Sequence, residues 1–381
     1  MRKEACLILS FFFLFLLAGC SPAATPHATG LGNGWEAERS LELSYAENFS
    51  VDYYAGGYAL LSIVDGSRFL VVPQGASVPE GIAADIRILQ QPIENIYLVA
   101  TSAMCLFDAL DGLSSIRLSG TAAEGWYIAG AQQAMEEGDI LYAGKYNAPD
   151  YELILSENCE LAIESTMINH TPEVKEKLEE LGIPVLTDQS SYESHPLGRT
   201  EWMKLYAVLL GQEDLAEQLF AEQIAYVDSV SGQPESGKTV AFFYISSSDY
   251  AVVRRSGDYV TKMIELAGGE YVFDTPGDPD SALSTINLEM EEFYAAAKDA
   301  DFLIYNSAIA GELTTLEELV AKNHLLADFK AVQNGNAWCM QENLFQETTQ
   351  LGLMIQDIHR MLTESEADET LTELNYLYKL Q

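Results

Sequence analysis

The chain has 381 residues, of which 48% are hydrophobic and 10% aromatic, so it can bury a sizeable core and wholesale disorder is excluded. Its 58 acidic side chains outnumber the 20 basic ones, which gives a formal net charge of -38. That charge argues against broad contact with nucleic acid or anionic lipid, because both require Lys and Arg. A small basic pocket inside so acidic a protein is still compatible with the composition.

The first twenty residues predict where the protein is located. Arg2 and Lys3 precede an almost wholly apolar run over 7–17, which is too short to span a bilayer but fits a secretory signal. Small residues and then Cys20 follow, and this pattern resembles the lipobox of bacterial lipoproteins, in which the signal is cut before the Cys and the Cys carries the lipid. An ordinary signal peptide followed by a chance Cys is the alternative.

We therefore expect a signal peptide over 1–19 and a lipidated, flexible tether over 20–35, which is rich in Pro, Thr, Ala and Gly. No later segment is long and apolar enough to cross a membrane. The expected location is the cell membrane, on its extracytoplasmic face, with lipid as the only anchor. The remaining cysteines have neither disulfide-framework nor metal-site spacing, and we expect buried hydrophobes at Cys105, Cys159 and Cys339.

From residue 68 to 190, short apolar runs alternate with helical patterns, which predicts parallel strands joined by right-handed helical crossovers. Alternating Tyr, Phe and polar residues over 41–64 predict an extra strand or hairpin on the edge. The expected strands are 68–73, 96–100, 115–119, 161–164 and 184–187, and the expected helices are 103–110, 127–137 and 172–181.

Residues 200–232 carry no strand signal, and their apolar residues recur at helical spacing over about five turns after a break at Gly211. The sequence thus predicts an α/β protein with two Rossmann-like lobes, 36–199 and 238–381, joined by the connecting helices and a long rigid helix at 200–232. The ligand cleft lies between the lobes. In the second lobe we expect strands at 239–246, 301–306 and 337–340, and helices at 259–267, 288–298 and 348–362.

The order of lipobox, α/β lobe, helical connector and second α/β lobe resembles one family, the class III solute-binding proteins of ABC importers. Residues 192–204 (YESHPLGRTEWMK) resemble the family's passage from the first lobe into the connecting helices. The glycines at 268–269 after an amphipathic helix, and the segment 298–301 before an apolar strand, also match. The resemblance covers nearly the whole mature chain.

The resemblance implies a monomeric binding protein rather than an enzyme, with no resident cofactor or metal. It implies a ferric siderophore, haem or cobalamin as the ligand, and a permease dimer with its ATPase as the partner. The family docks through one surface Glu on each lobe, and Glu152 and Glu289 occupy the matching positions. A carboxylate suits charge-assisted pairing with Arg. The alternative at each position is a helix-start Glu favoured by the helix dipole.

In open α/β sheets, ligands gather beyond the carboxyl ends of the strands, so two facing lobes place these ends across a cleft. Aromatic side chains there suit a large flat ligand. The residues selected in this way are Trp126, Tyr127, Glu164, Met167, Tyr192, Glu193, His195, Arg199, Tyr250, Arg254 and Arg255. The structural alternatives are core packing for Met167, turn orientation for His195 and pairing with Glu193 or Glu201 for Arg199.

Two adjacent arginines, Arg254 and Arg255, are unusual in so acidic a chain. Adjacent strand residues face opposite ways, so at most one of them faces the cleft, where it could bind a siderophore carboxylate or a haem propionate. A solvated pair is the alternative. For haem, Tyr192 or His195 is available as an axial ligand.

Two other functions are compared with chelate binding, namely binding of a free metal ion and hydrolysis. A free-metal site would need converging ligands such as His170, His195 and Glu164, but the chain has only five His and no His-rich loop. A lipid-anchored hydrolase lacks its motifs, since Gly-x-Ser-x-Gly and His-Glu-x-x-His are absent. A hydrolase would turn over its substrate, whereas a binding protein would bind it stoichiometrically.

Overall fold

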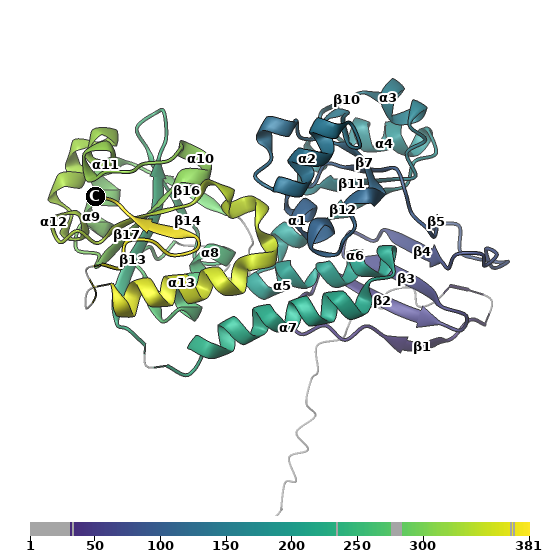
Figure 1. The fold of residues 1–381 in the computed structure, drawn as a ribbon, viewed down its shortest axis with the longest axis horizontal. Coiled ribbons are helices and arrows are strands. Elements are labelled where there is room, and N and C mark those ends of the chain that lie inside the picture. The colour runs from purple at the N-terminus through teal and green to yellow at the C-terminus, as the bar shows by residue number, and fades with distance from the viewer. Residues whose placement is uncertain (1–30, 33, 234, 276–283, 366–367, 369) are drawn as a thin grey trace, which may run out of the picture.

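The computed structural model describes residues 31–32, 34–233, 235–275, 284–365, 368 and 370–381. The expected signal peptide, the lipid-bearing Cys20 and most of the tether lie outside the described residues. The described chain is an α/β protein with two lobes joined by helices (Figure 1).

The first lobe contains a parallel sheet in the order β12-β11-β6-β7-β8, and helices alternate with its strands. Thr171 and Pro172 open one of these helices, and Gly182 follows its end with a positive φ of 83°, as the sequence suggests. The strands are β6 (Ile96–Leu98), β7 (Ile116–Ser119), β8 (Leu141–Tyr142), β11 (Leu161–Ser165) and β12 (Val185–Asp188), and the helices are α1 (Thr101–Ala109), α2 (Ala129–Glu137), α3 (Tyr151–Ser156) and α4 (Pro172–Glu180).

A second sheet precedes this one and differs from the expected edge hairpin. The segment 68–73, expected in the parallel sheet, instead pairs antiparallel with the preceding strand and parallel with the following one. The turn at Gly66, with a φ of 89°, returns the chain directly onto its neighbour, so pairing is local. The sheet order is β1 (Ala37–Ser40), β2 (Phe49–Tyr54), β3 (Tyr58–Ile63), β4 (Arg68–Val72) and β5 (Ile86–Gln90).

Three helices lead from the first lobe to the second: α5 (Pro196–Glu201), α6 (Met203–Leu210) and α7 (Glu213–Val230). Gly211 ends α6 in the left-handed conformation, with a φ of 69°, which is where the sequence predicts a break. The teal α7 runs beside the yellow α13 (Leu351–Glu364) beneath the second lobe (Figure 1).

The second lobe has a mixed sheet in the order β16-β14-β13-β17-β18-β19, with β15 beside β13. The sequence did not predict β14 and β16, which are antiparallel to their neighbours. A tight turn at Asp249, with a φ of 61°, folds β14 back onto β13. The strands are β13 (Lys238–Ile245), β14 (Ala251–Arg254), β15 (Gly269–Tyr271), β16 (Thr285–Leu288), β17 (Phe302–Asn306), β18 (Ala337–Met340) and β19 (Leu377–Lys379).

The helices of the second lobe cover this sheet and match the expected ones to within a few residues, apart from the short ones, which the sequence did not predict. The helix expected at 288–298 begins at Met290, because Glu289 has extended backbone and takes the position before the first helical residue. The helices are α8 (Tyr259–Leu266), α9 (Met290–Ala297), α10 (Ser307–Ala310), α11 (Leu316–Lys322) and α12 (Lys330–Gln333).

One apolar cluster runs through both lobes. It includes Leu98 of β6, Tyr206 of α6, Phe220 of α7, Trp338 of β18 and Met354 of α13, all of them buried. Buried apolar surface stabilises by about 25 cal/mol per Å², so separating the lobes would expose this shared core at a large cost. The lobes are therefore connected by packed helices over a common core, which restricts their relative motion.

Two buried carboxylates fix the N-terminal loop onto the connecting helices. The carboxylate of Glu201 accepts hydrogen bonds of 2.8–3.1 Å from the backbone N–H groups of residues 44–46, and Lys204 Nζ lies 3.3 Å from it. Glu193 accepts from the N–H groups of residues 47–48 and from Trp202 Nε1 at 2.9 Å. Five successive N–H groups of one loop are thereby satisfied by two side chains, Glu201 of α5 and Glu193 just before α5.

We expect Glu201→Gln to lower the free energy of unfolding by about 3 kcal/mol, because an amide NH₂ would then face N–H donors and Lys204 would lose a buried partner. Urea denaturation of the soluble chain measures this change. Glu217→Gln is the matched control, because Glu217 also pairs with Lys204, at 3.1 Å, but is exposed. An equal effect of the two substitutions would contradict the structural role of Glu201.

Candidate functional site

Two neighbouring chambers lie where the strand-end rule predicts a ligand. The larger, here called the first-lobe chamber, has a volume of about 600 Å³ and lies beyond the carboxyl ends of β6, β7 and β11. The end of β11 and the turn after it line both chambers. Ser165 and Met167 line the larger chamber, and Thr166 lines the smaller one. The first-lobe chamber is lined by Val99, Thr101, Gly120, Thr121, Ala122, Glu124, Gly125, Tyr142, Lys145, Tyr146, Ser165 and Met167.

The smaller, here called the arginine chamber, has a volume of about 280 Å³ and takes its walls from both lobes. Hydroxyl groups from the first lobe face guanidinium groups from α5 and β14. It is lined by Thr166, Ser191, Tyr192, Arg199, Arg254, Asp258, Tyr259, Ser284 and Phe345.

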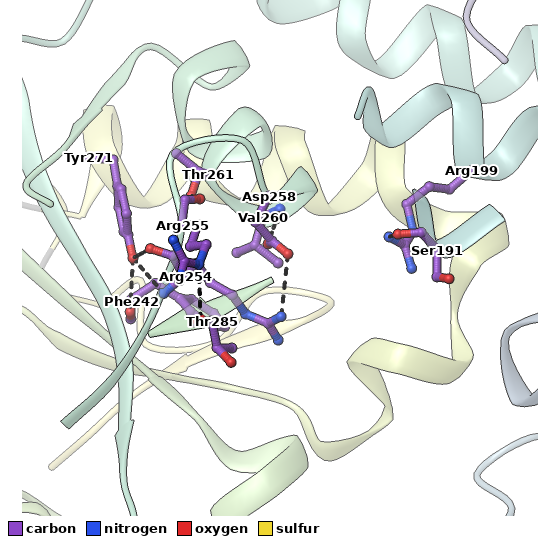
Figure 2. Close-up of polar contacts among 10 residues, drawn as sticks. All are labelled: Ser191, Arg199, Phe242, Arg254, Arg255, Asp258, Val260, Thr261, Tyr271 and Thr285. Atoms are coloured by element: carbon purple, nitrogen blue, oxygen red, sulfur yellow. Dashed lines mark hydrogen bonds and ion pairs between the residues drawn. The ribbon is translucent and has the colours of Figure 1, made fainter. Parts of the chain in front are cut away.

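Arg254 is held at the end of β14 with only 7% of its surface exposed. Its Nη1 lies 3.4 Å from Asp258 Oδ2 (Figure 2). Its guanidinium lies over the ring of Phe345, 5.1 Å from the centroid. The same Asp258 accepts the Val260 N–H at 2.9 Å and so caps α8. Burial raises the pKa of the Asp258 carboxyl, and the Arg254 charge opposes that rise.

Arg199 comes from α5, across from this pair (Figure 2). Its Nη1 donates to the carbonyl of Ser191 at 3.1 Å, and its guanidinium lies 3.9 Å from the centroid of the Tyr259 ring. The alternative pairing with Glu193 or Glu201 does not form, because those carboxylates are occupied by the N-terminal loop. Arg199 therefore connects the two lobes through a cation–π contact.

The adjacent Arg255 points elsewhere. Its Nε donates to the carbonyl of Thr285 at 3.2 Å, and it is not among the described residues that line the arginine chamber (Figure 2). β14 ends at Arg254, and Arg255 directly follows it, with its side chain on the Thr285 carbonyl and not in the chamber.

Three other residues selected from the sequence have structural contacts instead. Trp126 is buried and its Nε1 donates to Ser119 Oγ at 3.2 Å, while Glu193 is buried against the N-terminal loop. His195 stacks on Tyr45 at 4.4 Å, caps α5 by accepting the Leu197 N–H at Nδ1, and has a pKa lowered by burial. The strand-end rule selects residues by their position in the chain and does not say where their side chains point. It could therefore not distinguish these three buried or capping residues from Arg199, which lines a chamber.

Tyr127 lies at the rim between the lobes and is half exposed. Its hydroxyl donates to Glu342 Oε2 at 2.9 Å, its N–H donates to Gln346 Oε1 at 2.9 Å, and Gln346 Nε2 donates to the Gly125 carbonyl at 2.8 Å. Tyr250 lines neither chamber among the described residues.

The sequence missed Asp258, Tyr259 and Phe345, which complete the arginine chamber. Asp258 carried a usable signal, since it lies four residues after Arg254 and could have been paired with it. Tyr259 and Phe345 carried no such signal, because nothing in the neighbouring sequence distinguishes an aromatic residue in a chamber wall from one in the core.

The two predicted docking residues are exposed on different lobes. Glu152 is in the first turn of α3, and Glu289 is the residue that precedes α9. In the described part of the chain, no group of three or more His, Cys, Asp or Glu side chains is placed to hold a metal ion. Among the described helices, none combines the length and apolarity that a membrane span requires.

Comparison with known proteins identifies the class of protein that this fold and these chambers define. The periplasmic binding protein family matches residues 119–343, which is more than half of the chain, so the chain belongs to that family.

An uncharacterised lipoprotein of Methanocaldococcus jannaschii is 25% identical over 83% of this chain and 79% of its own length. The periplasmic haem-binding protein HutB of Vibrio cholerae has the same fold, with a TM-score of 0.57 at 17% identity over 70% of this chain and 98% of HutB. An ABC-type Fe³⁺-hydroxamate transport system protein of Saccharomonospora viridis gives a TM-score of 0.55 at 19% identity over 71% of this chain and 94% of that protein.

Glu164 lies on β11 directly before the residues that line the two chambers. Its side chain is fully buried, and among the described residues neither carboxyl oxygen has a hydrogen-bond partner. Burial raises the pKa of this carboxyl to about 8. The folded protein therefore binds a proton at Glu164 more tightly than the unfolded chain does.

We expect Glu164 to make stability fall as pH rises from about 4.5 to about 8, because the unfolded chain releases this proton before the folded one does. Glu164→Gln should remove that part of the slope and raise the free energy of unfolding at pH 8 by about 4 kcal/mol, with little change at pH 4.5. Urea denaturation across this pH range measures both. Glu176→Gln, on the exposed face of α4, is the control, and an equal gain at both pH values would contradict the argument.

Proposed function

We propose that the protein is the extracytoplasmic substrate-binding lipoprotein of an ABC importer, and that it captures an iron chelate of the ferric siderophore class and delivers it to a membrane permease. The observation that carries this proposal is the arginine chamber between the lobes, with the buried Arg254 and with Arg199 facing it, beside the larger first-lobe chamber.

The dimensions of the two chambers support a ligand of chelate size. Volumes of about 600 and 280 Å³ lie near the range of small-molecule sites. Tyr142, Tyr146 and Met167 supply apolar surface in the larger chamber, and guanidinium groups in the smaller one match carboxylate or phenolate oxygens. The iron-chelate cargo named for the Fe³⁺-hydroxamate relative adds weight to this assignment.

Haem is the second candidate ligand, and one observation favours it over cobalamin. Tyr192 is 47% exposed and lines the arginine chamber, so its phenol is available to ligate a haem iron beside two arginines that suit propionates. His195 is less suited to that role because its ring is stacked on Tyr45 and its Nδ1 is occupied. The haem cargo named for HutB supports the same alternative.

The same proposal assigns roles to the lipidated N-terminal segment and to the two exposed glutamates. Cys20 carries the lipid, the tether lets the body reach the permease, and Glu152 and Glu289 meet Arg residues of the permease dimer. No chemistry is performed on the ligand, which is bound stoichiometrically and released.

Ligand binding is tested with the soluble chain 21–381, by fluorescence titration with ferric siderophores, haem and cobalamin side by side. We expect one class to bind, and Arg199→Gln or Arg254→Gln to weaken that binding at least tenfold because a charged hydrogen bond is lost. Arg255→Gln is the matched control and should bind normally, since Arg255 faces Thr285. Failure of all three ligand classes would overturn the proposal, and visible spectra report haem ligation.

Docking is tested by the double variant Glu152→Ala, Glu289→Ala in cells that depend on this importer. Uptake of the bound chelate should be lost while the affinity of the purified variant for it stays unchanged, because both residues are exposed and neither lines a chamber. The control replaces Glu291 and Glu292, which are on the first turn of α9, just after Glu289. Loss of ligand affinity in the Glu152/Glu289 variant would refute the docking assignment.

A further inference from the structure

We infer that Asp258 is the specificity-determining residue of the arginine chamber, because it leaves the chamber with one net positive charge and so selects a ligand group that carries a single negative charge. The inference rests on the proposed function and deepens it by naming the charge of the group that the chamber accepts.

The charges of the described lining residues carry this inference. Three of these residues are charged, namely Arg199, Arg254 and Asp258. The Arg254–Asp258 pair is 3.4 Å apart with side chains only 8% and 4% exposed, so little water screens it and the two charges largely cancel at a distance. In the described part of the chain, no carboxylate lies within ion-pair distance of Arg199, which donates to a carbonyl and lies against an aromatic face. At longer range its charge opposes the rise that burial causes in the pKa of Asp188 and Asp258.

The carboxylate of Asp258 is fixed in place. Oδ1 accepts the Val260 N–H at 2.9 Å at the start of α8, and Oδ2 faces Arg254. It therefore stays beside an anion that approaches Arg254. Doubling the ligand's charge doubles its attraction to Arg199 and its repulsion by Asp258, while the cost of removing the ion from water rises roughly fourfold. A singly charged group, such as one carboxylate, is favoured over a doubly charged one.

Two probes with the same aromatic body and different charge test this selection. Benzoate carries one negative charge, and phenyl phosphate carries nearly two at pH 8. Binding of each to the soluble chain 21–381 is measured by calorimetric titration at constant ionic strength. The unaltered chain should bind benzoate more tightly than phenyl phosphate.

Asp258→Asn should tighten both, phenyl phosphate by about the square of the factor for benzoate, because the removed repulsion scales with ligand charge. Asn preserves the helix cap, and Asp258→Ser is a second neutral capping variant in case Asn at this position contacts Arg254 unfavourably. Glu265→Gln is the matched control, since it removes a negative charge from the exposed end of the same helix, where Glu265 pairs with Lys262. It should leave the ratio of the two affinities unchanged.

A preference of the unaltered chain for phenyl phosphate would overturn the inference, as would an unchanged affinity ratio in both Asp258 variants. Absence of binding by both probes would overturn it as well, while the proposed function would still be decided by the chelate titration. The probes could also show the expected charge selection while no chelate binds. That result would support the role of Asp258 and reject the importer assignment.

Discussion

The apolar cluster shared by the two lobes is the constraint on which the rest of the structure depends. It runs from β6 through α6, α7 and α13 to β18, so neither lobe completes its core without the connector. Because α5 and α8 are part of the same packed unit, the walls of the arginine chamber are held at a set separation, with Arg199 of one lobe against Tyr259 of the other. A chamber built in this way needs little reorganisation to receive a ligand, which preserves binding free energy.

A polar junction reinforces this apolar one. Glu193 and Glu201 bury their charges only because backbone N–H groups of the loop over 44–48 surround them. Burial raises the pKa of the Glu193 carboxyl, but its hydrogen-bond donors oppose that rise. Glu164 has no such partners among the described residues, and burial raises the pKa of its carboxyl to about 8. Buried glutamates thus have two effects: Glu201 stabilises the connecting helices, and Glu164, beside the chambers, makes the free energy of unfolding depend on pH.

Periodicity made most of the fold predictable, because a buried strand and an amphipathic helix leave different repeats in the sequence. It could not predict the separate sheet that contains β4, since a strand's pattern does not name its pairing partner, nor the antiparallel β14, which depends on one positive φ at Asp249. The candidate site was likewise predictable only in part. The sequence selected Arg199 and the arginine pair, but only the structure shows that Arg254 lines the chamber and that His195 caps a helix.

The rim contacts of Tyr127 have a kinetic consequence. They consist of exposed hydrogen bonds to Glu342 and Gln346, for which water competes, so each contributes about 1 kcal/mol or less. Three such bonds leave the rim parted for roughly 1% of the time. Local opening of this kind recurs within microseconds to milliseconds. These rim hydrogen bonds can therefore break and re-form many times a second while the shared core stays intact.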